Sequence, residues 1–452
     1  MSYPPISVTA LKTKINDKAY DSYYDYECPM DLYDIHQFTN GQPFHIYDEL
    51  RTNSPIYFQS PPAWDIEPGS WMLTSYEDII NVSSNPTIFS SQASTGNLLT
   101  LGNPETRHPK LWQTSIDHML NLDGSFHLNL RKEHMPFFKP GYVDDLHKKV
   151  EIKVKELLDN ISKIGKSNLV KDVSSELPIY TLSEVLGIPE EDRYKLFAWM
   201  EFLELAQYFG AETMKQTAGE IETMEVDPAM IEIFENTVSE MFEYGKDILH
   251  KKRKNPENDL LSAIANAELD GQKLSQEYLD GSWLLIIIAG NDTTRNSISG
   301  AIKLLTEFPE QKSKLLKNLD LLPNFAQETI RMVSPVIHMR RTTTCETTIG
   351  NQKLGPGEKV VMWYGAANRD PSVFIKPHEF NIERDNASKH LAFGMGRHTC
   401  LGKPIALMQL KEVYRQILTR FPDIHMDGEW KVAPNNFVHA IQEMPVSFTP
   451  EK

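Results

Sequence analysis

Cys400 lies between a glycine-rich loop and a helical pattern. The loop reads Phe393-Gly-Met-Gly-Arg-His-Thr-Cys-Leu-Gly402, and the run KPIALMQLKEVYRQIL follows it directly. Glycines allow the backbone to approach a flat partner closely. A cysteine at a helix start meets unpaired N–H groups and the positive end of the helix dipole, both of which favour the thiolate. The loop therefore predicts either a soft metal ligand or a buried, inert cysteine.

Two better-known uses of such a loop do not match its residues. The glycine spacing differs from that of a phosphate-binding loop, and no Lys-Ser/Thr follows it. A zinc site needs three or four Cys or His ligands, and the segment around Cys400 does not supply enough of them.

Asp292 and Thr293 interrupt a helix that is apolar on every side. The segment WLLIIIAGNDTTRN predicts a buried helix, in which an unpaired carboxylate is unfavourable. Asp292 could be a structural residue that caps a second helix. Alternatively, the helix crosses an active site, where Gly290 opens a groove, Thr293 binds a ligand or water, and Asp292 relays protons.

Two further pairs have helical spacing. Glu328 and Arg331 lie three residues apart. Such spacing alone most often indicates a surface ion pair, which contributes little to stability. His127 and Arg131 lie four apart and could form a solvated face or clamp an anionic group.

The elements that must position these residues are mostly helical. Residues 140–331 show apolar positions at spacings of three and four. Residues 70–91 predict a short strand and a helix that ends before Asn85, and residues 91–118 predict a long loop near a cavity. Around residues 341–363, the runs RRTTTCETTI and KVVMWY predict strands. We expect residues 1–40 to form a surface lead-in segment and residues 41–452 a single, mainly α domain with a small β-rich part.

Composition excludes several classes of protein. The 452 residues are 40% hydrophobic and carry a formal charge of -16, which disfavours a nucleic-acid binder with a general basic surface. Three scattered cysteines exclude a disulfide framework. The start of the chain has no secretory signal, and the longest uncharged stretch, 281–291, is too short to span a bilayer. We therefore expect a cytoplasmic protein without a membrane anchor.

Taken together in this order, the motifs resemble the cytochrome P450 family of haem-thiolate monooxygenases from about residue 40 to the end. AGNDTT corresponds to the oxygen-binding helix motif, ETIR to the acid-x-x-basic motif, and the loop around Cys400 to the haem-binding signature. The stretch ANRDPSVFIKPHEFNIER matches as well. The resemblance implies the P450 fold, a triangular prism with haem b between the oxygen-binding helix and the cysteine-loop helix.

The resemblance also implies roles for single residues. Cys400 is expected to ligate the iron, with Phe393, Gly394, Gly402 and Ala289 against the porphyrin, while Asp292 and Thr293 deliver protons. Glu328, Arg331 and Arg384 are expected to form a buried structural network. The residues expected to hold the haem propionates are His127, Arg131, Arg341 and His398, although Arg340 beside Arg341 leaves that assignment open.

One departure from the family pattern indicates which branch of the family the chain resembles. After the signature, many members have L-A-R-x-E, whereas this chain has Ile405-Ala-Leu-Met-Gln409. Similar endings, and pieces such as HMRRTTT, are typical of soluble bacterial members that hydroxylate alkanes or fatty acids, terpenoids and sterols. We therefore expect the protein to use O2 to hydroxylate a terminal or allylic methyl group of its substrate. The alternatives are a peroxygenase or rearrangement enzyme, and a non-enzymatic haem-based ligand sensor.

The expected substrate pocket is apolar, and the expected electron donor is a separate ferredoxin with its NAD(P)H-dependent reductase. The family's substrate contacts fall on Leu98, Leu99, Leu101, Phe202, Leu205, Phe209, Ile287, Ala289, Val336, Ile337 and Phe437. The basic residues expected to form the ferredoxin dock are Arg131, Lys132, Lys139, Arg397, Lys403 and Lys411. A monomer is expected.

Overall fold

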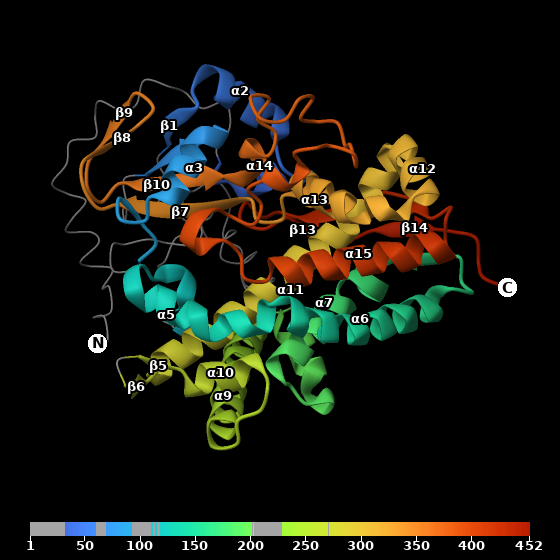
Figure 1. Ribbon diagram of the computed structural model, residues 1–452, viewed down its shortest axis with the longest axis horizontal. Helices are drawn as coiled ribbons and strands as arrows, with labels where there is room; N and C mark the ends of the chain where they lie inside the picture. The colour runs from blue at the N-terminus through green and yellow to red at the C-terminus, as the bar shows by residue number, and fades with distance from the viewer. Residues whose placement is uncertain are drawn as a thin grey trace.

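The computed structural model describes residues 32–59, 69–92, 110–111, 114, 118–200, 202, 228–269 and 271–452. Helices form most of the body, and the main sheet lies at one end with α2 and α3 beside it (Figure 1). The α-helices are α2 (Phe44–Asn53), α3 (Tyr76–Ser84), α5 (Gly124–His134), α6 (Pro140–Ile161), α7 (Glu176–Leu186), α9 (Pro228–Lys254), α10 (Leu260–Asn266), α11 (Gln276–Glu307), α12 (Pro309–Lys317), α13 (Leu322–Val333), α14 (Tyr364–Ala367) and α15 (Lys403–Arg420).

Short helices connect these elements. The 3₁₀-helices are η1 (Ile35–Phe38), η4 (Met119–Asn121), η5 (Met135–Phe138), η7 (Glu190–Asp192), η8 (Leu319–Leu321), η9 (Ala387–Lys389) and η10 (Gly396–His398). A π-helical turn, η6 (Val170–Ser174), precedes α7.

Proline and polar residues set several helix boundaries. Pro404 lies in the first turn of α15, where its missing N–H is not needed. Pro309 begins α12 directly after α11 ends. Asp259 caps α10 by accepting a hydrogen bond from the Ser262 N–H at 2.7 Å. Ser334 ends α13 in a left-handed conformation, before a proline. These local signals agree with the predicted helical stretch.

The largest sheet joins strands from both ends of the chain in the order β1-β2-β10-β7-β3. β10 pairs parallel to β2 and antiparallel to β7. The strands are β1 (Ile56–Gln59), β2 (Ser70–Leu73), β3 (Phe89–Ser90), β4 (Lys166–Asn168), β5 (Glu268–Leu269), β6 (Gln272–Lys273), β7 (His338–Thr343), β8 (Thr347–Ile349), β9 (Gln352–Leu354), β10 (Lys359–Trp363), β11 (His425–Met426), β12 (Lys431–Ala433), β13 (Ala440–Glu443) and β14 (Pro445–Ser447).

The strand and helix expected at residues 70–91 are confirmed as β2 and α3. The prediction of a single β-run in RRTTTCETTI is wrong. β7 ends at Thr343, where its pairing with β3 stops, and the chain bends before the β8–β9 hairpin.

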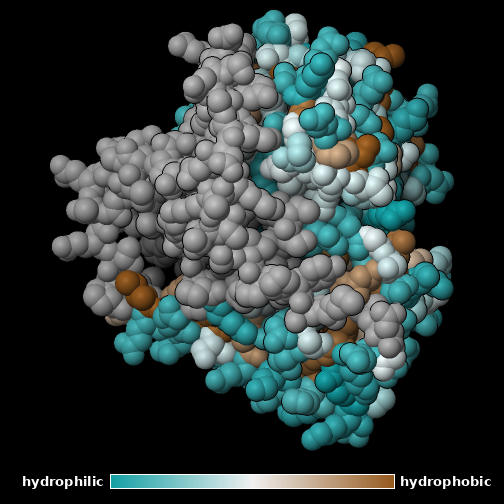
Figure 2. Space-filling view, turned by 90° about the vertical axis from the view of Figure 1, so that its left-hand side faces the viewer, coloured by the Kyte–Doolittle hydropathy of each residue, from teal (hydrophilic) through white to brown (hydrophobic). Residues whose placement is uncertain are grey.

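The main hydrophobic core surrounds α11, which contacts α7, α9, α13 and α15. Ile298, Ala301 and Leu305 are fully buried on this helix. Among the helices that the structure describes, none has the length and hydrophobicity needed to cross a membrane. On the side drawn in Figure 2, hydrophilic residues cover most of the described surface and hydrophobic ones form small patches.

The described part of the expected lead-in segment belongs to a second core. Leu32, Tyr33 and Phe38 are buried against Tyr47 and Trp363. The aromatic rings of Phe38 and Trp363 stack with centroids 6.0 Å apart. Residues 32–38 are therefore integral to the fold, and a domain boundary at residue 40 does not separate them from it. Residues 1–31 lie outside the described residues.

Candidate functional site

The cysteine loop is shaped by glycines in conformations that other residues rarely adopt. Gly394 and Gly396 have φ values of 67° and 73°. A Cβ on Gly396 would lie 2.7 Å from the carbonyl oxygen of Ser83, at the end of α3. The Cys400 N–H donates a 2.8 Å hydrogen bond to the Phe393 carbonyl, which closes the loop. The loop therefore fits tightly against α3 and presents Cys400 just before α15.

The electrostatics of Cys400 differ in part from the expectation. Burial raises the pKa of its thiol, although the backbone N–H groups of Gly402 and Lys403 oppose this shift, as do the charges of Arg131 and Lys403. The start of α15 thus lowers the pKa of the thiol, as predicted, but the opposite effect of burial is larger. Cys400 is enclosed by the protein and still has exposed surface. An open space must therefore lie against the thiol in the interior.

The middle of α11 also has exposed surface inside the molecule. Ala289 is exposed and Asp292 and Thr293 are partly exposed, whereas Ile287 and Thr294 on other faces are buried. The expectation that this helix is buried on every side is therefore wrong for this stretch. An exposed alanine in a central helix fits a wall of a cavity.

Hydrogen bonds fix the acid and alcohol of this stretch. The Thr293 hydroxyl donates to the Ala289 carbonyl at 3.3 Å. Asp292 Oδ1 accepts from Asn291 Nδ2 at 3.1 Å and lies 3.7 Å from Arg295 Nη2. Asp292 thus has polar neighbours on its own helix.

A cluster of nitrogen-bearing side chains surrounds Asp123, which the sequence analysis did not single out. His398 Nε2 lies 3.2 Å from Asp123 Oδ1, and the His398 ring stacks on His127 at 4.2 Å. Burial raises the pKa of Asp123, but hydrogen bonds from His398, Ser90 and the Ser91 N–H lower it below its usual value. Asp123 precedes the first residue of α5, so its position before Gly124 was the available signal.

The two neighbouring arginines of β7 point to different surroundings. Arg340 Nη2 donates to Ser70 Oγ on β2 at 3.3 Å. Arg341 interacts electrostatically with Asp123 and with His398. Since alternate residues of a strand face opposite sides, the cluster receives Arg341 and not Arg340.

The residues of this region fit a flat apolar group with a metal and anionic edges. Among the described residues, none makes a hydrogen bond to the buried Nδ1 of His127, and burial lowers the pKa of His127 to about 4. Arg131 on α5 donates to the Thr399 carbonyl of the cysteine loop. Donors and cations thus gather beside the cysteine loop, where Arg131 and His398 meet it. This arrangement matches what haem requires.

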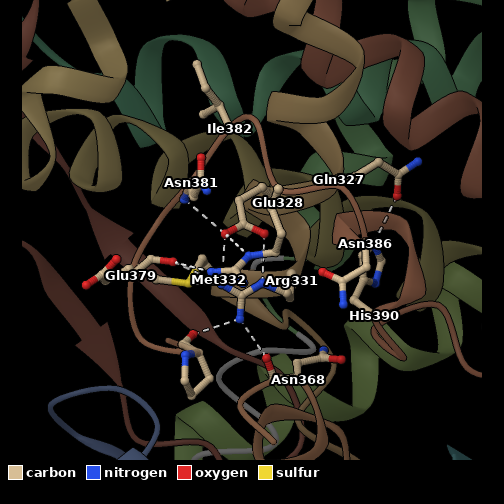
Figure 3. A network of polar contacts seen from close by, with 12 residues as sticks. Gln327, Glu328, Arg331, Met332, Asn368, Glu379, Asn381, Ile382, Asn386 and His390 are labelled. Carbon is tan, nitrogen blue, oxygen red and sulfur yellow. Dashed lines mark hydrogen bonds and ion pairs between the residues drawn. The ribbon is translucent and has the colours of Figure 1, made fainter. Parts of the chain in front are cut away.

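Glu328, Arg331 and Arg384 form a buried network, and Figure 3 shows Glu328 and Arg331 within it. Arg331 donates to both Glu328 oxygens at 2.7 and 2.8 Å, and Arg384 Nε donates to one of them at 3.0 Å. Arg331 Nη1 also donates to the Asn368 carbonyl at 2.7 Å. These two motif residues are therefore a buried pair rather than a surface ion pair.

The expected pocket residues have different positions. Val336 and Phe437 are partly exposed, and the Ile337 N–H donates to the Phe437 carbonyl at 2.8 Å. Phe202 stacks on Phe234 of α9 at 5.3 Å. Ile287 and Ile337 are fully buried in packed cores, so they do not present open surface. The remaining expected pocket residues lie outside the described residues; they are Leu98, Leu99, Leu101, Leu205 and Phe209.

The expected basic dock lies on α5, the start of α6, the cysteine loop and α15. Lys132, Lys139 and Arg397 are exposed. Arg131, Lys403 and Lys411 are partly exposed, and the Lys403 ammonium lies 5.4 Å from the centre of the Phe393 ring.

Known proteins with similar sequence and structure share one family. Residues 223–447 match the family model described as Cytochrome P450. The chain is 30% identical over 422 residues to linalool 8-monooxygenase of Pseudomonas putida, covering 93% of this chain and 99% of that one. It is 30% identical over 415 residues to steroid C26-monooxygenase of Mycolicibacterium smegmatis, covering 91% and 94%. A Mycobacterium marinum cytochrome P450 solved with pseudoionone superposes with a TM-score of 0.81 at 31% identity, covering 94% and 100%.

Proposed function

Because this chain belongs to the cytochrome P450 family, whose members bind haem b through a cysteine thiolate, we propose that it hydroxylates an unactivated C–H bond of a lipophilic small molecule. The observation that carries the proposal is the exposed surface of Cys400 within the protein, directly before α15. Bound haem with a thiolate ligand supplies the activation of O2.

Cys400 is the residue that would ligate the iron. The conformations of Gly394 and Gly396 let the loop backbone lie close to a flat group. The Gly402 and Lys403 N–H groups point at the sulfur and stabilise its negative charge. Metal binding supplies the further stabilisation that the buried thiolate needs.

The cluster around Asp123 would hold the two propionates. His127, Arg131, Arg341 and His398 supply donors, and charge-assisted hydrogen bonds to carboxylates are short and strong. The unpartnered Nδ1 of His127 gains a partner in this way.

Asp292 and Thr293, in the middle of α11, would donate and accept the protons of the reaction. The Thr293 hydroxyl can donate a hydrogen bond into the cavity when it leaves the Ala289 carbonyl, since a contact of 3.3 Å is long. Asp292 can exchange a proton with water and with its neighbours. General acid–base groups placed in this way contribute roughly 10²–10⁴-fold to rate.

The substrate class follows from the apolar lining and from the named relatives. Val336, Phe437 and Ala289 offer apolar surface, and the similar enzymes are named for linalool and for a steroid. We therefore assign a terpenoid, an alkane or fatty acid, or a sterol, attacked at a terminal or allylic methyl group.

The test is an absorption titration of the purified haem protein with acyclic terpene alcohols, linear alkanes, fatty acids and sterols. A bound lipophile should displace water from the iron and shift the spectrum to high spin, and the saturating class should then yield a hydroxylated product with O2 and an electron donor. A haem protein that shifts with none of these classes would contradict the assigned substrate. Purified protein that binds no haem would contradict the proposed function itself.

The electron donor in this proposal is an acidic ferredoxin that docks beside the cysteine loop. Arg397→Glu should slow reduction several-fold at low salt, because complementary charges raise association rates. The difference should shrink at high salt, where screening weakens the attraction. Stopped-flow reduction measures both, with Lys148→Glu on the exposed face of α6 as control. Equal rates for Arg397→Glu and the unaltered protein at low salt would refute the dock.

A further inference from the structure

Three aromatic side chains connect the interior of α11 to the molecular surface. The centroid of the Trp283 ring lies 5.9 Å from that of Tyr244 and 6.1 Å from that of Trp199. Trp199 and Tyr244 are 5.3 Å apart, so each ring contacts the other two. Trp283 and Trp199 are buried, whereas Tyr244 on α9 is partly exposed. This aromatic cluster therefore begins at the central helix and ends at solvent.

The cluster is closely packed around Trp283. A Cβ on Gly245 of α9 would lie 2.5 Å from the Trp283 ring, so the ring reaches the helix backbone only because residue 245 is glycine. Trp283 Nε1 donates a 3.0 Å hydrogen bond to the Met241 carbonyl. A backbone carbonyl is too weak a base to take up the indole proton. Loss of an electron therefore leaves Trp283 as a radical cation, which oxidises a neighbouring phenol.

Tyr244 has a base that accepts its proton. Its hydroxyl donates a 2.9 Å hydrogen bond to Asp192 Oδ2. A hydrogen bond from Lys195, 2.8 Å away, lowers the pKa of Asp192 and keeps it a carboxylate at neutral pH. A phenol that loses an electron becomes a strong acid and gives its proton to such a base. The Asp192 side chain is 24% exposed, so the proton can pass on to water.

A second tryptophan–tyrosine pair lacks this exit. The rings of Trp363 and Tyr47 have centroids 5.8 Å apart, and both side chains are fully buried. Among the described residues, none makes a hydrogen bond to the Tyr47 hydroxyl. Aromatic contact alone thus does not provide a route for an electron and a proton together. Tyr47 is therefore a matched comparison for Tyr244.

Trp283 lies close to the expected haem site. It precedes the exposed Ala289 by six residues of α11, which is about 9 Å along the helix axis. Electrons tunnel through protein over such distances faster than an enzyme completes a turnover. The aromatic cluster is thus within reach of an oxidant that forms at the haem.

We propose that Trp283, Trp199 and Tyr244 carry oxidising equivalents from the haem site to the surface when no substrate reacts, and so protect the protein from oxidation. This inference rests on the proposed function. Tyr244 gives one electron through the indole rings to the oxidised haem site, and its proton goes to Asp192. A small thiol at the surface then returns a hydrogen atom to Tyr244, while Asp192 releases the proton to water.

Two such transfers complete the reaction. The unused oxygen atom at the haem takes up two electrons from the aromatic cluster and two protons from water, and leaves as water. Two thiols lose one hydrogen atom each and join in a disulfide. The oxidant is thus consumed at an accessible tyrosine, and the haem and the pocket residues are spared.

The first test mixes the substrate-free haem protein with hydrogen peroxide and freezes it for electron paramagnetic resonance. The unaltered protein should show a tyrosyl radical, and Tyr244→Phe, which keeps the ring packing, should weaken this signal several-fold. Asp192→Asn should weaken it as well, because it keeps the phenol but removes the base. The control Tyr47→Phe should retain the radical. Equal tyrosyl signals in Tyr244→Phe and Tyr47→Phe would overturn the inference.

The second test measures the protection itself. With peroxide, a thiol and no substrate, Tyr244→Phe should lose its haem absorbance several-fold faster than Tyr47→Phe. With a saturating substrate, the two variants should form product at the same initial rate, because neither residue belongs to the reaction site. Equal rates of haem loss would show that the cluster does not protect.

The third test follows the electron transfer without haem chemistry. Azide radicals produced by pulse radiolysis oxidise tryptophan in the purified protein, and the tryptophan radical should decay as a tyrosyl radical forms. Tyr244→Phe should slow this conversion several-fold relative to Tyr47→Phe, and equal rates would exclude the transfer.

The failure of this inference and the failure of the proposed function are distinguishable. If the purified protein binds no haem, the proposed function fails, and pulse radiolysis still reports on the cluster. If the protein hydroxylates a lipophile while Tyr244→Phe matches Tyr47→Phe in all three tests, only the protective role fails.

Discussion

Single side chains of the site depend on neighbours that lie far away in the chain. His398 is oriented by Asp123, 275 residues earlier, and Arg341 reaches the same carboxylate from β7. Motif spacing identified Cys400 and His398, because their neighbours in sequence carry the pattern. Spacing could not identify Asp123, because its partners come from other elements. The same holds for the choice between Arg340 and Arg341, which the two faces of β7 decide.

Thr293→Ala tests the hydroxyl group that α11 contributes to the site. Removing the hydroxyl should leave substrate binding intact but release peroxide in place of product, so that product per NAD(P)H falls roughly tenfold or more. Parallel measurement of NAD(P)H, product and peroxide checks this. Thr294→Ala is the control, since Thr294 belongs to the same turn but is buried on another face. Full coupling in Thr293→Ala would exclude the proton-relay role.

At the scale of elements, the site depends on how the cysteine loop fits between α3 and α15. The helix after Gly402 and the strand–helix unit at residues 70–84 were predictable, because proline, capping residues and apolar periodicity act locally. The division of RRTTTCETTI into β7 and β8 was not predictable, because β7 ends where its pairing with β3 ends. The burial of the Glu328–Arg331 pair could not be predicted from its spacing either, because residues 368–384, far away in the sequence, cover it.

Gly396→Ala should distort the loop. The new methyl group would meet the Ser83 carbonyl at 2.7 Å, and the φ of 73° disfavours alanine by roughly 1–2 kcal/mol. We expect lower haem content and a lower melting temperature, measured by absorbance and thermal unfolding. Gly141→Ala in the first turn of α6 should be neutral or stabilising, because nothing lies near its added Cβ. Equal haem content in the two variants would contradict this account of the loop.

At the scale of the whole molecule, the interior contains several histidines that burial keeps neutral. Burial lowers the pKa of His118, His134 and His439 to about 4. It lowers the pKa of His338 and His390 to about 3. His134 ends α5 and His338 begins β7, whereas His118, His390 and His439 lie in the segments before η4, after η9 and before β13. The five side chains are thus spread along the chain, so they link the stability of the entire fold to acidity.

Stability should fall as the pH drops below about 6.5. In that range the unfolded chain binds protons on these histidines while the folded protein does not, so each contributes a slope of up to about 1.4 kcal/mol per pH unit until its folded pKa is reached. Urea unfolding between pH 7 and pH 5 measures the slope. His439→Gln should remove the contribution of one buried histidine from this slope. A stability that is constant over this range would refute the prediction.

The pairing of β2 with β10 has a consequence for synthesis. Ser70 and Lys359 are register partners, and the Leu32 carbonyl accepts a hydrogen bond from Asn436, 404 residues later. A ribosome adds about 5–20 residues per second, so β2 waits roughly 15–60 s for its parallel partner. The cysteine loop appears later still. During that interval β2 can pair with β1 but its other edge is unpaired, and the yield of folded protein should depend on the chaperones that cover this edge.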